Sequence, residues 1–177
     1  MTANALIVGY GNPLRGDDGF GGLAAGYVEE RQIPGLEVIV SHQLNPELAA
    51  SLHDSSHAIF LDAVASAPTC ATKAPVGGSG GDQPGTLRAT PVERCDLSSS
   101  GMHHFEPGSL LALAQAIYGQ APPATLITAT ARSFNHGSEI SAEVRQAAAT
   151  AAEAIASAAA SGTLDSEILS NTLRERR

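Results

Sequence analysis

The feature that most constrains the fold is a regular alternation of short apolar runs with amphipathic helical segments. The runs expected to form strands are residues 5–9, 36–40, 58–62, 86–92 and 125–130. The segments expected to form helices are residues 17–31, 108–118 and 141–160, with a further helix that begins near Pro46. Strands that alternate with helices form βαβ units. The pattern therefore predicts an α/β chain, a three-layer αβα sandwich around a mostly parallel twisted sheet.

The later part of the chain refines this prediction. Residues 66–85 are rich in Gly, Ala, Pro and Thr, which indicates a flexible loop. Because residues 86–92 follow that loop and not a helix, their strand is expected at an edge, where it can run antiparallel. Asn45 is the expected N-cap of the second helix, with Pro46 as its first residue. Residues 1–163 are expected to form a single domain, and residues 164–177 a polar, frayed tail that can be removed without loss of activity.

Charge and cysteine content exclude several classes of partner. The formal net charge of −8 argues against a nucleic-acid footprint and against an anionic membrane surface. No apolar stretch is long enough to span a bilayer, and the N-terminus does not have the pattern of a signal peptide. Cys70 and Cys95 lack C-x-x-C spacing, which favours two free thiols. We therefore expect a cytoplasmic protein that binds neither nucleic acid nor membrane.

The turn after the first strand carries two glycines, Gly9 and Gly11, but does not fit a dinucleotide site. Leu14 stands where a G-x-G-x-x-G fingerprint needs its third glycine. Asp17 and Asp18 would also place negative charge at the helix start, where a phosphate should bind. Helix capping is the simplest interpretation of Asp17, and it remains an alternative for Asp18.

Ligands of open α/β sheets bind beyond the carboxyl ends of the strands. Asp62 directly follows an apolar strand, where a carboxylate without a partner is costly to bury. A solvated strand end is the alternative. His103 and His104 follow a Ser/Gly loop, and a structural surface histidine is the alternative there. Two carboxylates and an imidazole at one edge would suit either an oxygen/nitrogen metal site or an acid/base cluster.

The motif GYGNPLRGDDGFG at residues 9–21 closely resembles the opening motif of the hydrogenase maturation endopeptidases. Three later segments resemble that family in the same order. They are FLDA at residues 60–63, PGT at residues 84–86, and His104 followed by a helix, Gly119 and Pro122. The resemblance covers roughly residues 4–160.

The resemblance implies an αβα endopeptidase that removes a C-terminal extension from the nickel-loaded precursor of a [NiFe] hydrogenase large subunit. In this family the substrate brings the nickel, so no cofactor of the enzyme's own is expected, although other divalent ions can occupy the site. The family's acidic, Asp and His positions match Asp18, Asp62 and His104, which are the predicted catalytic and metal-binding residues. The predicted substrate-binding residues are Asn12, His42 and His103.

The chain departs from the family at two places. Many relatives carry Glu where this chain has Asp18, which reaches one methylene less far. Residues 42–46 replace a Gly-Gly-Thr type segment, so the particular hydrogenase is left open, and His42 can join the site. The chain has no cysteine-protease signature or H-E-x-x-H pair. Its G-x-S-x-G string at residues 77–81 lies within the Gly-rich segment and not between a strand and a helix, as a nucleophile elbow requires. Two other functions stay open: a metallohydrolase that holds its own divalent ion, and a non-enzymatic binding or chaperone module for hydrogenase assembly.

Overall fold

A computed structural model describes residues 4–65, 83–95 and 105–175 of the chain. The strands are β1 (Ala5–Tyr10), β2 (Leu36–Ser41), β3 (His57–Ala65), β4 (Leu87–Pro91) and β5 (Ala124–Ala131). The helices are a 3₁₀ segment η1 (Pro13–Gly19), then α1 (Phe20–Glu29), α2 (Leu48–His53), α3 (Pro107–Tyr118), α4 (Ala142–Ser161) and α5 (Ser166–Glu175).

One sheet joins all of these strands in the order β2-β1-β3-β5-β4. The pairs that β1 makes with β2 and β3, and the pair between β3 and β5, are parallel. β4 pairs antiparallel with β5 at one edge. The predicted sheet, including its antiparallel edge strand, is therefore confirmed.

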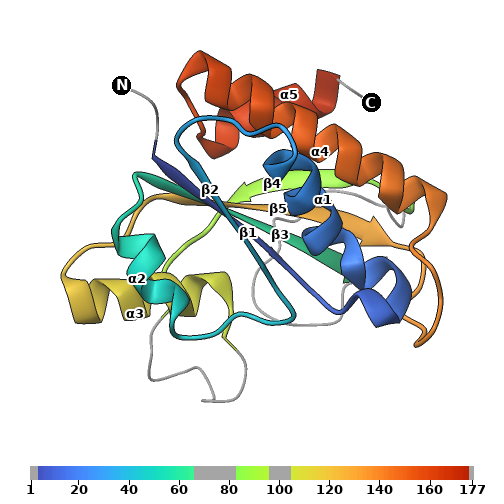
Figure 1. Cartoon of the computed structure of the whole chain (residues 1–177), viewed down its shortest axis with the longest axis horizontal. Helices are drawn as coiled ribbons and strands as arrows, with labels where there is room; N and C mark the ends of the chain where they lie inside the picture. Colours follow the sequence, from blue (N-terminus) through green and yellow to red (C-terminus); the bar gives the residue numbers. More distant parts are fainter. Residues whose placement is uncertain (1–3, 66–82, 96–104, 176–177) are drawn as a thin grey trace.

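Helices cover both faces of the sheet (Figure 1), as a three-layer αβα sandwich requires. The helices α1, α4 and α5 lie on one face, and a large apolar cluster fills the space beneath them. The shorter helices α2 and α3 lie on the other face over a smaller cluster. Each strand contributes alternate residues to the two clusters, because successive side chains of a strand point to opposite faces.

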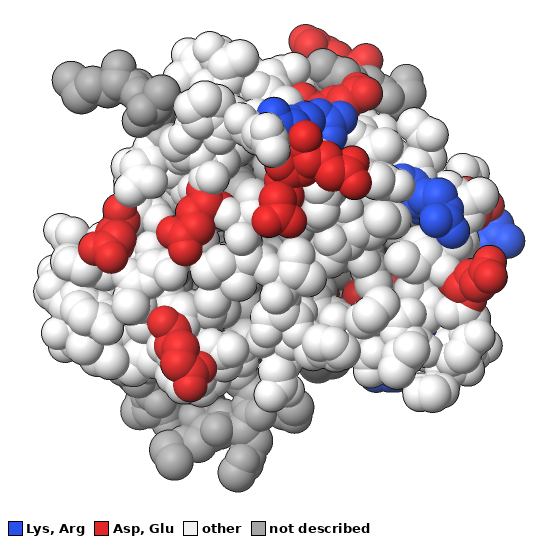
Figure 2. Space-filling model, viewed as in Figure 1, with Lys and Arg blue, Asp and Glu red and all other residues white. Residues whose placement is uncertain are grey.

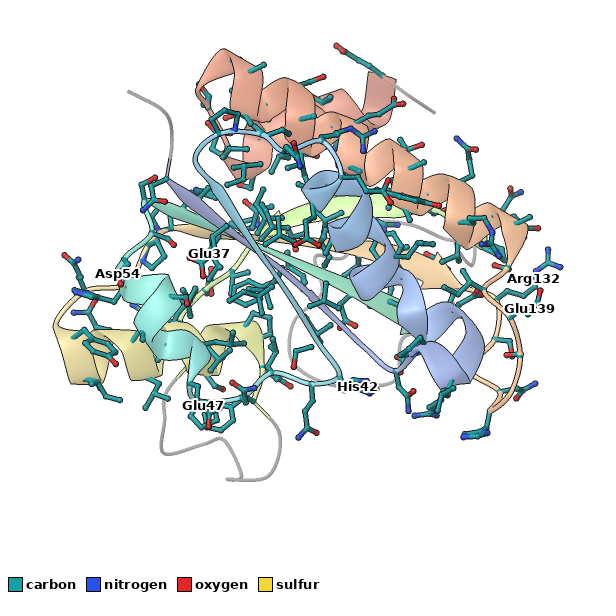
Figure 3. The ribbon with its side chains drawn as sticks, viewed as in Figure 1. Glu37, His42, Glu47, Asp54, Arg132 and Glu139 are labelled. Carbon is teal, nitrogen blue, oxygen red and sulfur yellow. The ribbon has the colours of Figure 1, made fainter. Side chains whose placement is uncertain are left out.

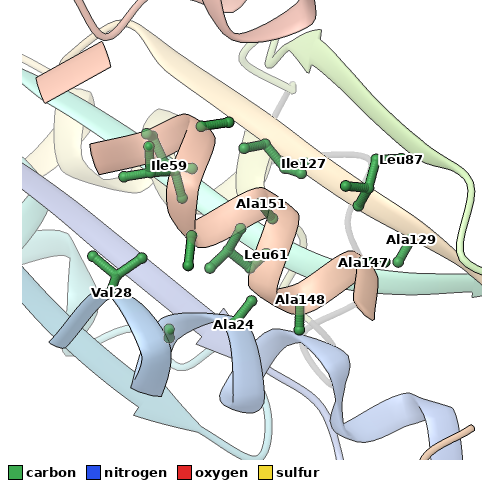
Figure 4. Close-up of a cluster of buried hydrophobic side chains, with 14 of the residues drawn as sticks. Ala24, Val28, Ile59, Leu61, Leu87, Ile127, Ala129, Ala147, Ala148 and Ala151 are labelled. Atoms are coloured by element: carbon green, nitrogen blue, oxygen red, sulfur yellow. The ribbon is translucent and has the colours of Figure 1, made fainter. Parts of the chain in front are cut away.

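Small residues allow α1 and α4 to approach the sheet closely. Figure 4 shows alanines of α4 against the large cluster, among them Ala147, Ala148 and Ala151, all nearly or fully buried. Where α1 crosses the sheet, a Cβ atom on Gly21 would come within 2.3 Å of the carbonyl oxygens of Leu61 and Tyr10. A side chain at Gly21 would therefore push the helix away from the strands.

Three predicted boundaries are wrong. The helix expected from residue 17 begins at Phe20, because the preceding segment forms η1, which is kinked where Gly16 adopts a φ of 60°. The second helix has Glu47 at its N-cap, and the Oδ1 atom of Asn45 is buried without a hydrogen-bond partner. β3 continues past Asp62 to Ala65 and does not end at the carboxylate.

The C-terminal region is also more ordered than expected. Residues 166–175 form α5, which packs against β4 and α4. Leu169 and Leu173 of this helix are buried in the large cluster. The expectation of a frayed polar tail is therefore wrong, because two leucines one helical turn apart supply an apolar face.

Two further findings concern the described residues. Cys95 is a free thiol, as expected, while Cys70 lies outside the described part of the chain. Within residues 4–65, 83–95 and 105–175, no helix has the length and apolar character needed to cross a bilayer.

Candidate functional site

The register of the sheet brings Tyr10 and Asp62 side by side at its carboxyl edge. β1 and β3 are parallel, and Gly9 pairs with Leu61. The next residue on each strand is therefore Tyr10 on β1 and Asp62 on β3. Phe60, two residues before Asp62, belongs to the cluster under α2 and α3, so Asp62 faces the same layer.

A row of polar side chains extends from this pair across the sheet. Tyr10 pairs with Ser41 of β2, and Asp62 pairs with Thr128 of β5. Thr128 in turn pairs with Arg88 of the antiparallel edge strand. Directly paired residues share a face of the sheet, so all of these side chains lie on the α2/α3 side.

Asp62 is half-buried and is held by two hydrogen-bond donors. The phenol of Tyr10 donates a hydrogen bond to its carboxylate, and the backbone N–H of Ala63 donates to Oδ1 at 2.8 Å. Burial raises the pKa of Asp62 to about 6, and the negative charge of Asp18 adds to this rise, while both hydrogen bonds oppose it. Asp62 is therefore ionised at neutral pH but unusually ready to gain a cation or a proton.

Tyr10 remains protonated because its surroundings disfavour a phenolate. Burial raises the pKa of its hydroxyl, and the negative charges of Asp62 and Glu106 raise it further. Glu106 is the N-cap residue of α3, so this helix delivers a carboxylate toward the same edge. Sequence reasoning missed Tyr10, although the parallel register of the first and third strands would have placed it beside Asp62.

Asp18 lies in the turn that follows β1. Its Oδ2 atom accepts a hydrogen bond from the backbone N–H of Asn12 at 2.9 Å. The turn depends on Gly11, whose φ is 133° and whose Cβ atom would come within 1.9 Å of the Asp18 carbonyl oxygen. Because α1 begins only at Phe20, Asp18 does not cap that helix. The fold instead brings its charge close enough to Asp62 to raise that pKa.

Asn12, one of the predicted substrate-binding residues, also has a structural part. Its Oδ1 atom accepts a hydrogen bond from the backbone N–H of Leu14 at 3.0 Å and so caps η1. The side chain therefore helps to shape the turn that carries Asp18.

Asp17 is a buried structural residue and not a helix cap of α1. Its carboxylate is 1% exposed and accepts hydrogen bonds from three backbone N–H groups, those of Arg132, Ser133 and Ser141. Burial alone would raise its pKa, but these hydrogen bonds outweigh burial and lower it. The capping interpretation of Asp17 is therefore wrong, because the carboxylate binds the loop between β5 and α4.

That loop also carries a surface ion pair. The guanidinium of Arg132 pairs with the carboxylate of Glu143 in the first turn of α4. Arg132 is labelled in Figure 3 at the end of the molecule where α4 begins.

His42 lies exposed directly after β2, next to Ser41, which pairs with Tyr10 (Figure 3). It therefore shares the carboxyl edge with the carboxylates. His103 and His104 lie outside the described residues. In the part of the chain that the structure describes, no three His, Cys, Asp or Glu side chains are grouped closely enough to hold a metal ion. The described side chains that share this edge are thus the carboxylates Asp18, Asp62 and Glu106 and the imidazole of His42.

No family model and no curated protein sequence matches this chain. Solved structures do. A hydrogenase 2 maturation peptidase from Thaumarchaeota archaeon SCGC_AB-539-E09 is 26% identical, with a TM-score of 0.57 over 88% of this chain and 97% of that one. The [NiFe] hydrogenase maturation protease HycI from Thermococcus kodakarensis KOD1 is 21% identical, with a TM-score of 0.63 over 88% and 91%.

The hydrogenase maturating endopeptidase HybD from E. coli is 20% identical, with a TM-score of 0.61 over 90% of this chain and 94% of that one. Each of these structures matches 88–90% of this chain and 91–97% of its own. The resemblance first drawn from residues 9–21 is thereby confirmed, and the chain has the fold of the hydrogenase maturation endopeptidases.

Proposed function

We propose that this protein is an endopeptidase that removes a C-terminal extension from the nickel-loaded precursor of a [NiFe] hydrogenase large subunit. The observation that carries the proposal is the pair of carboxylates, Asp18 and Asp62, at the carboxyl edge of an αβα fold shared with maturation proteases. The opening motif at residues 9–21 supports the same assignment.

The chemistry of the carboxylates fits recognition of a metal that the substrate carries. Burial is the main cause of the raised pKa of Asp62, and repulsion by the negative charge of Asp18 adds a smaller part. A divalent cation between them would relieve it. Carboxylate and imidazole ligands suit nickel, so we assign Asp18, Asp62 and His104 to contacts with the substrate's nickel. The protein then needs no metal of its own.

Docking through the metal would position the bond to be cut. Holding the scissile peptide beside fixed groups makes attack by water effectively intramolecular, which can supply a large part of the rate enhancement. Water adds to the carbonyl carbon, the C–N bond breaks, and a proton goes to the leaving amine. We propose Asn12, His42 and His103 as contacts to the peptide around that bond.

The acidic character of the protein indicates the kind of surface that it would meet. The net charge is −8, and on the face drawn in Figure 2 acidic side chains outnumber basic ones. Glu37, Glu47 and Asp54 lie on this face around β2 and α2 (Figure 3). A precursor with a basic surface would therefore associate faster than a neutral one, with a rate that falls as salt is added. We place the reaction in the cytoplasm.

A processing assay tests the proposal. Purified protein is mixed with the large-subunit precursor from the same source, with and without nickel, and the precursor's intact mass is followed. We expect loss of a short C-terminal peptide from the nickel-loaded form alone. Asp62→Asn and His104→Ala should leave the precursor uncut, while the control Glu167→Gln, at an exposed position of α5 in the opposite layer, should cut normally. Normal cutting by Asp62→Asn and His104→Ala together would refute the site.

The same materials separate the two alternative functions. Elemental analysis that finds about one tightly held metal per chain would favour an autonomous metallohydrolase. A stable complex with nickel-loaded precursor but no cleavage would favour a binding or chaperone module.

A further inference from the structure

We propose that Tyr10 is a positioning residue: its hydroxyl fixes the Asp62 carboxylate in the orientation that receives the metal centre of the substrate. This inference rests on the proposed function and adds to it a residue outside the acidic and histidine positions. Tyr10 is not assigned to contact the substrate itself.

The contact is built into the sheet. Tyr10 and Asp62 are the residues that follow the Gly9–Leu61 pair on adjacent parallel strands. Both strands are hydrogen-bonded on each side, β1 between β2 and β3, and β3 between β1 and β5. The two side chains therefore start from fixed backbone positions on the same face of the sheet.

The Asp62 carboxylate is held from two directions. Ala63 N–H donates to Oδ1 from within β3, and the Tyr10 hydroxyl donates from the neighbouring strand. The first contact is made by a residue adjacent in sequence, so it restrains the carboxylate only locally. The second crosses between strands and sets the direction of the carboxylate relative to the turn that carries Asp18.

The ring and the hydroxyl of Tyr10 have separable roles. The ring packs against the apolar cluster under α2 and α3, which phenylalanine can do equally well. The hydroxyl is kept as a donor because burial and the two carboxylates, Asp62 and Glu106, disfavour its ionised form. Phenylalanine would therefore preserve the packing and remove only the hydrogen bond to Asp62.

The expected effect follows from the role of hydrogen bonds that orient a metal-ligating side chain without contacting the metal. Removing a partner that orients a ligating side chain commonly lowers affinity or activity by about 10–100-fold. Here the number of charged ligands is unchanged, so binding of the precursor should change little. The misplaced carboxylate should instead lower kcat, because small displacements from the reactive geometry are costly.

The test is Tyr10→Phe in the full-length chain, with the other tyrosines of the chain as matched controls, Tyr27→Phe in α1 and Tyr118→Phe at the end of α3. In the processing assay we expect Tyr10→Phe to lower kcat by about 10–100-fold with KM within about threefold of the unmodified protein. The controls should be unaffected. A kcat within twofold of the unmodified protein, or a rise in KM alone, would overturn the positioning role.

A second readout does not depend on activity. In protein labelled with ¹³C at aspartate carboxyl carbons, the Asp62 signal is identified by its loss in Asp62→Asn. At a fixed pH of about 8, Tyr10→Phe should shift that signal, while Tyr27→Phe and Tyr118→Phe should not. If the unmodified protein cuts no precursor, the proposed function fails. The ¹³C signal of Asp62 would still show whether Tyr10 and Asp62 are hydrogen-bonded. An unmoved Asp62 signal in Tyr10→Phe would overturn the inference whatever the activity.

Discussion

Asp17 and Ser141 are 124 positions apart in sequence, yet Oδ1 of Asp17 accepts a hydrogen bond from the Ser141 backbone N–H at 2.7 Å. Ser141 is the N-cap of α4, and its own side chain accepts from Val144 N–H. Through this contact the turn after β1 is fixed to the start of the longest helix. The segment that carries Asp18 is thus held by a buried carboxylate in the residue just before it.

We expect Asp17→Asn to lower the free energy of unfolding by about 2–4 kcal/mol at pH 7, because hydrogen bonds to a buried charge are strong and buried donors would lose their acceptor. Denaturant unfolding measures this, with exposed Asp54→Asn as the matched control. A loss no larger than that of the control would contradict the structural role.

The same contact predicts how stability depends on pH. The folded pKa of Asp17 lies below its ordinary value of about 3.9. Its contribution is therefore complete above that value and is lost as the pH falls through the folded pKa. The difference between the unmodified protein and Asp17→Asn should shrink in acid, in unfolding curves recorded from pH 7 down to pH 3.

Gly21→Ala should destabilise the protein severely, whereas Gly26→Ala in the same helix should not. The new Cβ atom at Gly21 would lie 2.3 Å from two backbone oxygens of the sheet, while at Gly26 no atom lies within 4 Å. Alanine also has the higher helix propensity, so Gly26→Ala should stabilise by about 0.5–1 kcal/mol. Thermal unfolding of both variants measures the contrast. Equal effects would mean that α1 does not pack as described.

Asp62→Asn should stabilise the fold at pH 8 while it abolishes processing. The pKa of Asp62 is about 6 in the folded protein, above its ordinary value, so ionisation costs stability as the pH rises from about 4 through 6. Because Asp62 is only half-buried, we expect a gain of about 1–2 kcal/mol, less than the full shift implies. The gain should vanish near pH 4, where Asp62 is protonated. A variant that is less stable than the unmodified protein at pH 8 would contradict this electrostatic account.

Leu169→Ala should lower the free energy of unfolding by about 2–4 kcal/mol, because its side chain is fully buried between α5 and the sheet. Exposed Asn171→Ala on the same helix is the control. A chain that ends before residue 166 should unfold at a lower temperature than the full chain. An unchanged melting temperature would contradict this prediction and would mean that residues 164–177 do not contribute to stability.

The sequence by itself determined the layers of the fold. Periodicity predicted the strands and most helices, and the Gly- and Pro-rich composition of residues 66–85 indicated the antiparallel edge strand. These predictions succeed because the residues that form each element lie close together in the chain. The prediction from sequence missed α5. Most residues of this segment are polar, and the burial of Leu169 and Leu173 depends on the large cluster that other parts of the chain form.

Only the tertiary structure decided which carboxylate does what. Asp17 and Asp18 are adjacent in sequence and equal in charge, but successive side chains of η1 point in different directions. Asp17 is therefore buried against the start of α4, while Asp18 accepts a hydrogen bond from Asn12 in the turn after β1. The contact between Tyr10 and Asp62 likewise depends on the register of two strands that are far apart in the chain. Burial and hydrogen bonding set the pKa and the orientation of a carboxylate. The residues that bury and hydrogen-bond these carboxylates are distant in sequence, so local sequence patterns do not predict which role each carboxylate has.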